Sequence, residues 1–218
     1  MSQGPRSVRT QVKRLPARGH YERGTIDAIL DEALHCHVGF SVDGQPFVIP
    51  TIHVRVGDRL ILHGSTASRM LRRLGEGVPA CVTVTLLDGL VLARSAFHHS
   101  MNYRSVMALG MMTAVDSAEK EDALRKLVDH VAPGRSDHVR GPSARELAQT
   151  TVLQMNLAEA SAKVRTGPPV DDEGDLSLDV WAGELPIRLV TFPPLPDPLL
   201  GTDIPVPEHV SGYRRPRP

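Results

Sequence analysis

The chain has 218 residues, a length that favours one domain or two, and its 25 basic side chains are matched by 25 acidic ones. Because the formal net charge is zero, no overall field draws the protein to nucleic acid or to an anionic membrane. With 41% hydrophobic and 23% charged residues, the composition is that of a globular protein that folds without a disulfide or a structural metal.

Composition divides the chain into three parts. Residues 1–23 form a basic arm, residues 24–192 a single folded domain, and residues 193–218 a tail that holds eight prolines. Such a density of proline excludes long helices and central strands from the tail. The N-terminus lacks the apolar run of a signal peptide and no later segment has 18 apolar residues, so we expect a cytoplasmic protein.

The first half of the domain begins with one helix and continues in strands. Helical spacing of apolar residues predicts a helix over 25–34 with Thr25 as its cap. Runs of β-branched residues, broken by short turns, then predict an antiparallel meander. Its strands are 36–42, 46–56 and 59–65. A short basic helix follows, ending near Leu74, and its candidate caps are Ser65, Thr66 and Ser68.

The second half adds more strands and two capped helices. Residues 80–95 are predicted as two strands around a turn at Asp88-Gly89, and 105–117 as one or two more. Two pairs of residues have the spacing of a capping box, namely Asp116 with Glu119 and Ser143 with Glu146. Closing strands are expected within 151–165 and 181–192. The pattern predicts a mainly β fold, a barrel with peripheral helices.

The strand, turn and helix between Leu60 and Leu74 have the features of an anion site. Gly64 permits close approach of the backbone, the hydroxyls of this turn can donate hydrogen bonds, and Arg69 supplies a forked cation. A phosphate group fits, although a capped surface helix explains the same residues. The chain has no G-x-G-x-x-G and no Walker motif, so any nucleotide is held differently from a Rossmann or P-loop site.

Ten histidines raise the question of a metal or haem site. His35 and His37 share a strand face, while His53 and His63 lie on neighbouring strands. No histidine spacing matches a zinc motif, and two or three histidines on a barrel rim arise easily by chance, so these histidines favour neither a metal nor a haem site. His63, beside the anion site, is the candidate catalytic residue.

Seven motifs together resemble a known family. They are RLPARGHY at 14–21, CHVGF, GQPFVIPTIHVR, LILHGSTASRM, NYRSVMALG, SAKVRTGPP and VWAGELPI. In this order they resemble the pyridoxamine 5′-phosphate oxidase-like flavoproteins, in the nitroimidazole-reductase-like branch of the FMN-binding split barrels. The resemblance implies a six-stranded antiparallel split barrel, a homodimer, and an FMN at each end of the dimer interface that both chains bind.

The resemblance also implies roles for individual residues. The strand beside the flavin ring contains Ile49, Pro50, Thr51 and Ile52. The residues that touch the flavin and its ribityl chain are His63, Gly64, Ser65 and Thr66, and those that bind the phosphate are Ser68 and Arg69. The residues that approach across the interface are Tyr103, Arg104 and Ser105, and Trp181 closes the pocket. Met70 stands where many relatives have lysine; the loss of this cation would weaken FMN binding or leave room for a different flavin, unless Arg72 or Arg73 substitutes for it from one turn further on.

Three functions follow as expectations. The first is an FMN-dependent oxidoreductase that acts on a small molecule through the flavin N5, with NAD(P)H as a candidate donor. The second is a non-catalytic split-barrel protein that binds a flavin, FAD included, or haem. The third is a deazaflavin-dependent reductase. The residues that bind pyridoxal phosphate in the true oxidase are not recognisable, so oxidation of vitamin B6 is not expected.

Overall fold

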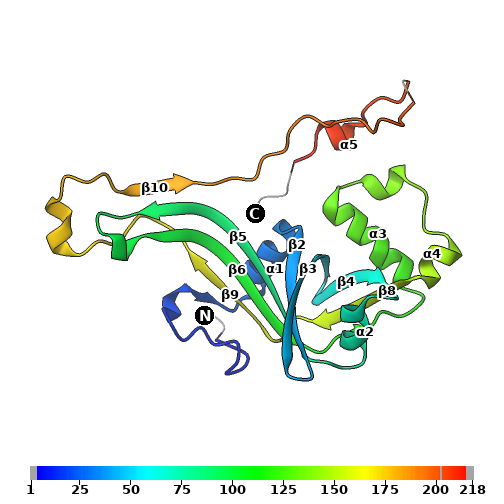
Figure 1. Cartoon of the computed structure of the whole chain (residues 1–218), viewed down its shortest axis with the longest axis horizontal. Helices are drawn as coiled ribbons and strands as arrows, with labels where there is room; N and C mark the ends of the chain where they lie inside the picture. The colour runs from blue at the N-terminus through cyan, green and yellow to red at the C-terminus, as the bar shows by residue number, and fades with distance from the viewer. Residues whose placement is uncertain (1–3, 202, 215–218) are drawn as a thin grey trace.

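Antiparallel β-structure dominates the computed structural model, which describes residues 4–201 and 203–214 (Figure 1). Residues 1–3 of the predicted arm, and 202 and 215–218 of the predicted tail, lie outside the described part. The strands are β1 (Gly19–His20), β2 (His35–Val42), β3 (Gln45–Val56), β4 (Arg59–Ser65), β5 (Ala80–Leu92), β6 (Ser100–Gly110), β7 (Thr113–Ala114), β8 (Thr150–Asn156), β9 (Ala160–Arg165) and β10 (Gly183–Pro186). The helices are α1 (Arg23–Glu32), α2 (Arg69–Gly75), α3 (Lys120–Val131), α4 (Ala144–Ala148) and α5 (Glu208–Ser211).

The described strands form one strongly curved sheet. Their order is β1-β9-β6-β5-β2-β3-β4-β8-β7, and β10 pairs with β5 beside this path. The sheet has ten strands and does not close, whereas the resemblance implied a barrel of six. Part of the excess consists of the short strands β1, β7 and β10, which add two to four residues each at the margins of the sheet.

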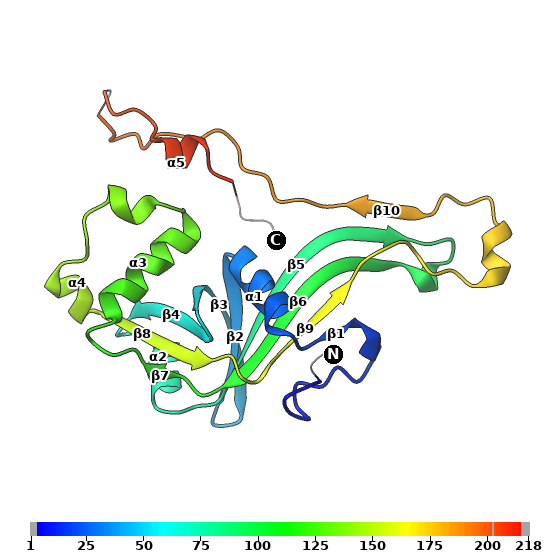
Figure 2. The ribbon, with the colours of Figure 1, turned by 180° about the vertical axis from the view of Figure 1, so that it is seen from behind.

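Two apolar clusters fill the fold. The larger lies within the curve of the sheet around α1, whose Ile26, Ile29 and Leu30 are each 1% exposed. The smaller lies beneath α3 and includes Leu127 and Val152. Figure 2 shows α3 and α4 at one end of the molecule and β10 at the other. Among the described residues, no helix has both the length and the apolar character needed to cross a membrane.

The capping predictions have mixed outcomes. Ser68 caps α2 by accepting a hydrogen bond from the Leu71 amide (3.4 Å), and Ser143 caps α4 in a full capping box with Glu146. The prediction for Thr25 is wrong, because α1 begins two residues earlier after Glu22 and the Thr25 hydroxyl donates to that carboxylate (2.7 Å). At α3 the cap is Glu119 without a side-chain bond, and Asp116 accepts from the Ala118 amide instead.

The predicted turn at Asp88-Gly89 is also wrong. β5 runs without interruption from Ala80 to Leu92 and pairs with β6, with a register shift between Leu87 and Gly89. A bulge of this kind places one extra residue in the strand and changes the direction in which its side chain points. At this bulge the Asp88 carboxylate accepts two hydrogen bonds from Arg104 on β6 (2.9 and 2.7 Å).

A long segment crosses the molecule after β10. We call residues 187–207 the strap. At one end β10 pairs with the outer half of β5. At the other, the Tyr213 hydroxyl donates to the Val131 carbonyl (3.0 Å) and His209 stacks on His138. The strap therefore joins the two ends of the molecule while most of its own side chains remain exposed.

Candidate cofactor site

A gap between β3 and β4 is the first candidate site. Residues 45–52 of β3 pair with β2, but from His53 onward β3 pairs with β4 instead. The β3–β4 ladder stops at His53 and Leu62, and β4 continues alone beside β8 through His63, Gly64 and Ser65. Beyond this point, at Ile52 on β3 and His63 on β4, the edges of the two strands that face each other therefore have no β-ladder between them. Such edges offer backbone donors and acceptors to a polar ring.

The gap ends at α2, where Arg69 is held in place by an aromatic ring. The Arg69 guanidinium lies 4.6 Å from the centre of the Phe47 ring, and Phe47 stacks on Phe40. Ser65 accepts a hydrogen bond from the Ala67 amide (3.1 Å), which leaves its hydroxyl proton able to serve a ligand, and Thr66 is exposed beside it. A fixed guanidinium and two adjacent hydroxyls can bind a phosphate.

Burial favours the neutral form of His63. Its Nδ1 is buried and has no hydrogen-bond partner among the described residues, and burial lowers the pKa of its imidazole. The residue after it is Gly64, where an added Cβ would lie 2.9 Å from the Leu71 side chain. The missing side chain thus lets α2 pack directly against the end of β4. A neutral imidazole at the edge of the gap can exchange one hydrogen bond with a bound ring.

The structure brings together the predicted residues of β3, β4 and α2. The remaining ones lie elsewhere in the chain. Tyr103 and Ser105 are on β6, which β5 and β2 separate from β3. Arg104 binds both Glu32 and Asp88. Trp181 is 69% exposed and lies against Gly183, at the far end of β5. The structure therefore does not bring these side chains together with those of β3, β4 and α2 on one strand pair.

The structure also contains a pocket that the sequence does not predict, because segments distant along the chain enclose it. On the edge that faces β2 and β10, β5 pairs with β2 through Ala80–Thr83 and with β10 through Gly89–Leu92, which leaves the residues between without a strand neighbour. A pocket of about 750 Å³ lies at this break, and we call it the window pocket. Its lining residues are Glu32, Ala33, Leu34, His35, Thr85, Leu86, Leu87, Asp88, Arg104, Pro186, Ile187, Arg188 and Leu189.

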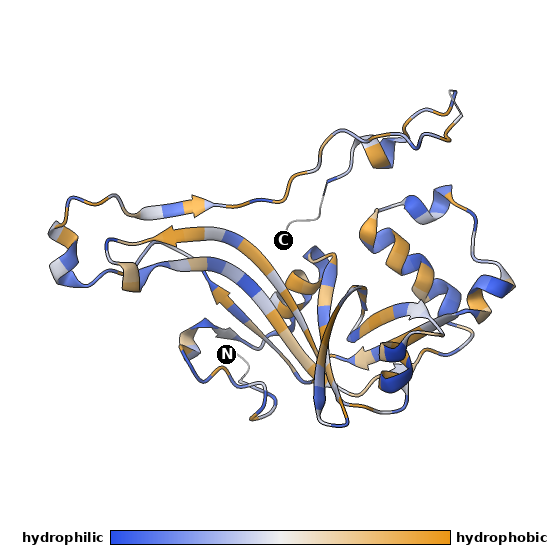
Figure 3. Cartoon of the chain, in the orientation of Figure 1, coloured by the Kyte–Doolittle hydropathy of each residue, from blue (hydrophilic) through white to orange (hydrophobic). Residues whose placement is uncertain are grey.

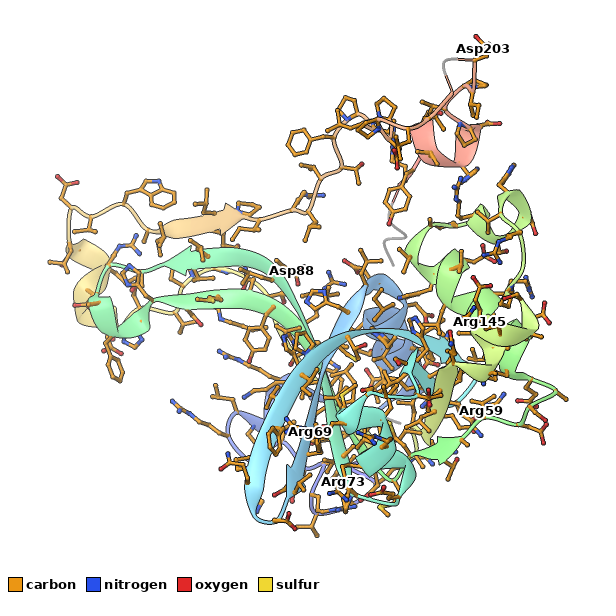
Figure 4. The ribbon with its side chains drawn as sticks, turned by 45° about the vertical axis from the view of Figure 1, so that its right-hand side comes forward. Arg59, Arg69, Arg73, Asp88, Arg145 and Asp203 are labelled. Carbon is orange, nitrogen blue, oxygen red and sulfur yellow. The ribbon has the colours of Figure 1, made fainter. Side chains whose placement is uncertain are left out.

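The gap and the window pocket are distinct but adjoining. In Figure 4 the labelled Arg69 lies at the β2–β3 hairpin, whereas Asp88 lies higher, on β5 below the strap. His35, which lines the window pocket, is the Cα partner of Ile52, which borders the gap. Within the described chain, no group of three or more His, Cys, Asp or Glu side chains is placed to hold a metal ion.

Comparisons with known proteins agree on the fold. The family model described as pyridoxamine 5′-phosphate oxidase matches residues 22–164. No curated protein sequence is significantly similar. Among solved structures, the flavocytochrome Anf3 of Azotobacter vinelandii is 45% identical, with a TM-score of 0.92 over 97% of this chain and 99% of that one.

Two further structures extend this comparison. An FAD- and haem-binding protein of Mycobacterium smegmatis is 36% identical, with a TM-score of 0.87 over 89% of this chain and 96% of that one. A 5-nitroimidazole antibiotic resistance protein of Bacteroides thetaiotaomicron shares the fold at 24% identity, with a TM-score of 0.55 over 67% of this chain and 86% of that one. The family model covers well over half of the chain, and two solved structures exceed 30% identity. The chain belongs to the pyridoxamine 5′-phosphate oxidase-like family, whose split-barrel fold it shares with flavin-binding proteins.

Proposed function

We propose that this protein is a redox protein that binds a flavin in the gap between β3 and β4 and also binds haem. One observation supports the flavin site. β3 pairs with β2 up to Ile52 and with β4 only from His53, so the facing edges of β3 and β4 have unpaired backbone groups near Arg69. A flavin combines a flat ring with many polar edge atoms and an anionic phosphate. Unpaired backbone groups suit the ring, and the guanidinium suits the phosphate.

The residues of the gap have separate tasks in this proposal. Arg69, together with the hydroxyls of Ser65, Thr66 and Ser68, binds the phosphate and sets the position of the ring. The backbone of residues 49–52 bonds to the ring edge, and neutral His63 exchanges one hydrogen bond with it without adding charge. When bound, a flavin supplies hydride or single-electron transfer at N5. We expect a soluble donor such as NAD(P)H and a small-molecule acceptor.

FAD is the flavin we propose, in place of the FMN that the resemblance implied. The M. smegmatis protein, which is 36% identical, is described as binding FAD. Met70, which follows Arg69 and stands where the family resemblance implies a lysine in many FMN-binding relatives, has its side chain buried in the larger apolar cluster and so supplies no second cation to the phosphate.

Support for haem comes from the two most similar structures described above. One is a flavocytochrome and the other is described as binding haem. The donor set is consistent with this ligand, because a porphyrin supplies four of the iron's ligands and the protein needs to provide only one or two. When bound, haem supplies one-electron chemistry.

Analysis of the released cofactors tests both halves. The protein is produced with added iron and a haem precursor, denatured, and its small molecules are identified by chromatography and mass spectrometry. We expect one FAD and one haem b per chain. FMN or a deazaflavin in place of FAD would contradict the choice of flavin, a colourless protein that ignores every added flavin would end the flavin proposal, and failure to bind added haem would end the haem half.

A homodimer is the assembly we propose. Alternate residues of β2, β3 and β5 form an outer face of the sheet, and none of them is Lys, Arg, Asp or Glu. They are His37, Val48, Pro50, Ile52, Cys81 and Thr83. Val48 is 67% exposed, so a second copy on this face would bury apolar surface. The family resemblance implies that Tyr103 and Trp181 then approach the flavin across this interface.

The dimer is tested by placing a charge on the outer face. Thr83→Arg should yield a monomer in sedimentation velocity, with weakened flavin binding, because a buried unpaired cation opposes association. Ser117→Arg, at an exposed position before α3, is the matched control. A dimer that persists in Thr83→Arg with its flavin intact would contradict the assembly.

A further inference from the structure

We propose that the window pocket is the haem site, with His35 as the axial ligand of the iron and Arg188 as the partner of a propionate. The inference rests on the haem half of the proposed function and adds to it a place and a ligand. It follows from the break in the sheet, the apolar walls, the donor atoms and the charges of the pocket.

The break in the sheet creates a slot rather than a surface hollow. β2 pairs with β5 up to the His37–Thr83 register, and β10 pairs with β5 only from Gly89. The Ile187 amide donates to the Asp88 carbonyl (2.9 Å), so the strap begins at the edge of the opening. The opening is thus framed by β5, by the start of β2 and by the strap. Its volume of about 750 Å³ lies within the range of roughly 300–1,000 Å³ that holds drug-sized and cofactor-sized ligands.

The walls of the pocket contain exposed apolar side chains. Leu87, Ile187 and Leu189 line it, yet they are 42%, 37% and 79% exposed. Figure 3 shows apolar residues recurring along the extended chain from β10 into the strap, above β5. Clustered apolar side chains that face an open volume gain about 25 cal/mol for each Å² that a ligand removes from water. A flat apolar macrocycle would contact both the β5 wall and the strap.

One side chain in the pocket can bind iron. Among the described lining residues, His35 is the only one of the usual haem ligands, which are His, Cys, Met and Tyr. It is the first residue of β2, where the ladder with Ile52 fixes its backbone, and its ring makes an edge contact with His37 (5.7 Å between ring centres). His37 does not line the pocket. The two neighbours therefore differ in access to a ligand, although they share a strand and a face.

The charges of the pocket place the propionates at its rim. Glu32 and Asp88 are both engaged by Arg104, so the floor holds a connected ion cluster with no cation to spare. Arg188 lies on the exposed strap and forms no ion pair within the described residues. A propionate would avoid the two carboxylates and pair with this guanidinium. The gap, by contrast, has its cation at Arg69, so the two sites suit different cofactors.

Haem titration of the flavin-loaded protein tests the assignment. Wild type, His35→Ala and His37→Ala are each titrated with haem b, and the dissociation constant and the Soret and electron paramagnetic resonance spectra are recorded. We expect His35→Ala to weaken binding at least about tenfold and to lose the signature of a nitrogen ligand, which added imidazole restores. His37→Ala should change affinity less than about twofold. Arg188→Ala should weaken binding about three- to tenfold, more so at low salt.

The outcomes separate this inference from the function on which it rests. If wild type binds no haem, the haem half of the proposed function fails and the site assignment fails with it. If wild type binds haem and His35→Ala binds it equally well with an unchanged spectrum, the haem function stands and the site is overturned. Equal losses in His35→Ala and His37→Ala would also overturn His35 as the ligand. Retained flavin and an unchanged thermal midpoint show that each variant is folded.

Discussion

His35 and Ile52 face each other across the β2–β3 ladder as Cα partners. Residues paired in this way have Cβ atoms about 4.5–5.5 Å apart. Because Ile52 borders the gap proposed for the flavin and His35 lines the pocket proposed for haem, a single pair of strand residues separates the two sites. The two cofactors would therefore be close enough to exchange electrons directly.

This proximity predicts electron transfer inside one molecule. After photoreduction of the flavin in protein loaded with both cofactors, the haem should be reduced without a mediator. Its rate constant should not change over a hundredfold dilution, because both centres lie in one assembly. Stopped-flow or flash spectroscopy at flavin and Soret wavelengths measures it. A rate that falls in proportion to protein concentration would show that the two centres are far apart.

Replacing Arg69 should release the flavin. Its guanidinium is fixed over Phe47, and a hydrogen bond to a charged group contributes about 1.5–3 kcal/mol, so Arg69→Ala should weaken flavin binding roughly 10- to 100-fold. Arg73→Ala is the matched control, since Arg73 lies on the same helix (Figure 4) and is paired with Glu76 (3.0 Å). Fluorescence titration of apoprotein with FAD measures both. Equal losses in the two variants would point to α2 itself and not to the guanidinium.

Replacing Arg104 should destabilise the fold but leave the affinity for the flavin unchanged. Arg104 joins the end of α1 to the bulge of β5 through two partly buried carboxylates. Its loss leaves both carboxylates without a partner, and we expect Arg104→Met to lower the free energy of unfolding by about 1–3 kcal/mol. Arg140→Ala breaks an exposed pair with Glu146 and should cost less than about 1 kcal/mol.

Urea unfolding of the apoprotein measures this difference, and FAD titration measures the effect on binding. If Arg104→Met weakens FAD binding as strongly as Arg69→Ala, the role implied by family resemblance is the correct one, and Arg104 reaches the flavin of a partner chain.

Acid should destabilise the protein through His53. Its ring is fully buried, its Nε2 donates to the Leu30 carbonyl (3.0 Å), and burial lowers its pKa from 6.5 to about 4. Between these values the unfolded chain binds a proton that the folded protein excludes. The contribution is therefore complete above about pH 6.5 and is lost as the pH falls through 4, on the order of 3 kcal/mol in all.

His53→Gln keeps a donor for the Leu30 carbonyl and removes the titration, so its unfolding free energy should depend less on pH between 6.5 and 4. The exposed His99 provides the control His99→Gln, which should keep the wild-type slope. Urea unfolding at half-unit pH intervals measures the slopes. Identical slopes in His53→Gln and wild type would assign the acid sensitivity to other groups.

Local chemistry made part of this structure predictable. Ser68 and Ser143 act through hydrogen bonds within one helical turn, so spacing along the chain was enough to identify them as caps. Asp88-Gly89 has the composition of a hairpin turn but lies in a continuous strand, because β6 pairs with β5 on both sides of the bulge. A preference of two residues for a turn is weaker than a ladder of this length.

Features that depend on pairing between segments far apart in the sequence could not be predicted from it. Nothing in the residues from Ile49 to Val54 marks the point where β3 exchanges β2 for β4. The window pocket combines the end of α1, the middle of β5 and the strap, which are adjacent only after folding. The sequence indicates that His35 shares a strand face with His37, yet the access of His35 to the pocket depends on where β10 begins to pair with β5.

The strap is held at both ends, by β10 on β5 and by the Tyr213 hydroxyl on Val131. A free tail that covers a ligand would lose its full range of conformations at that moment, at a cost in conformational entropy. A segment with both ends fixed has already lost much of that freedom. Closing its loop costs entropy once, and this cost rises only slowly with loop length. The anchors on β5 and α3 therefore bear that cost during folding, and a ligand in the window pocket meets a cover whose reach is already limited to the opening.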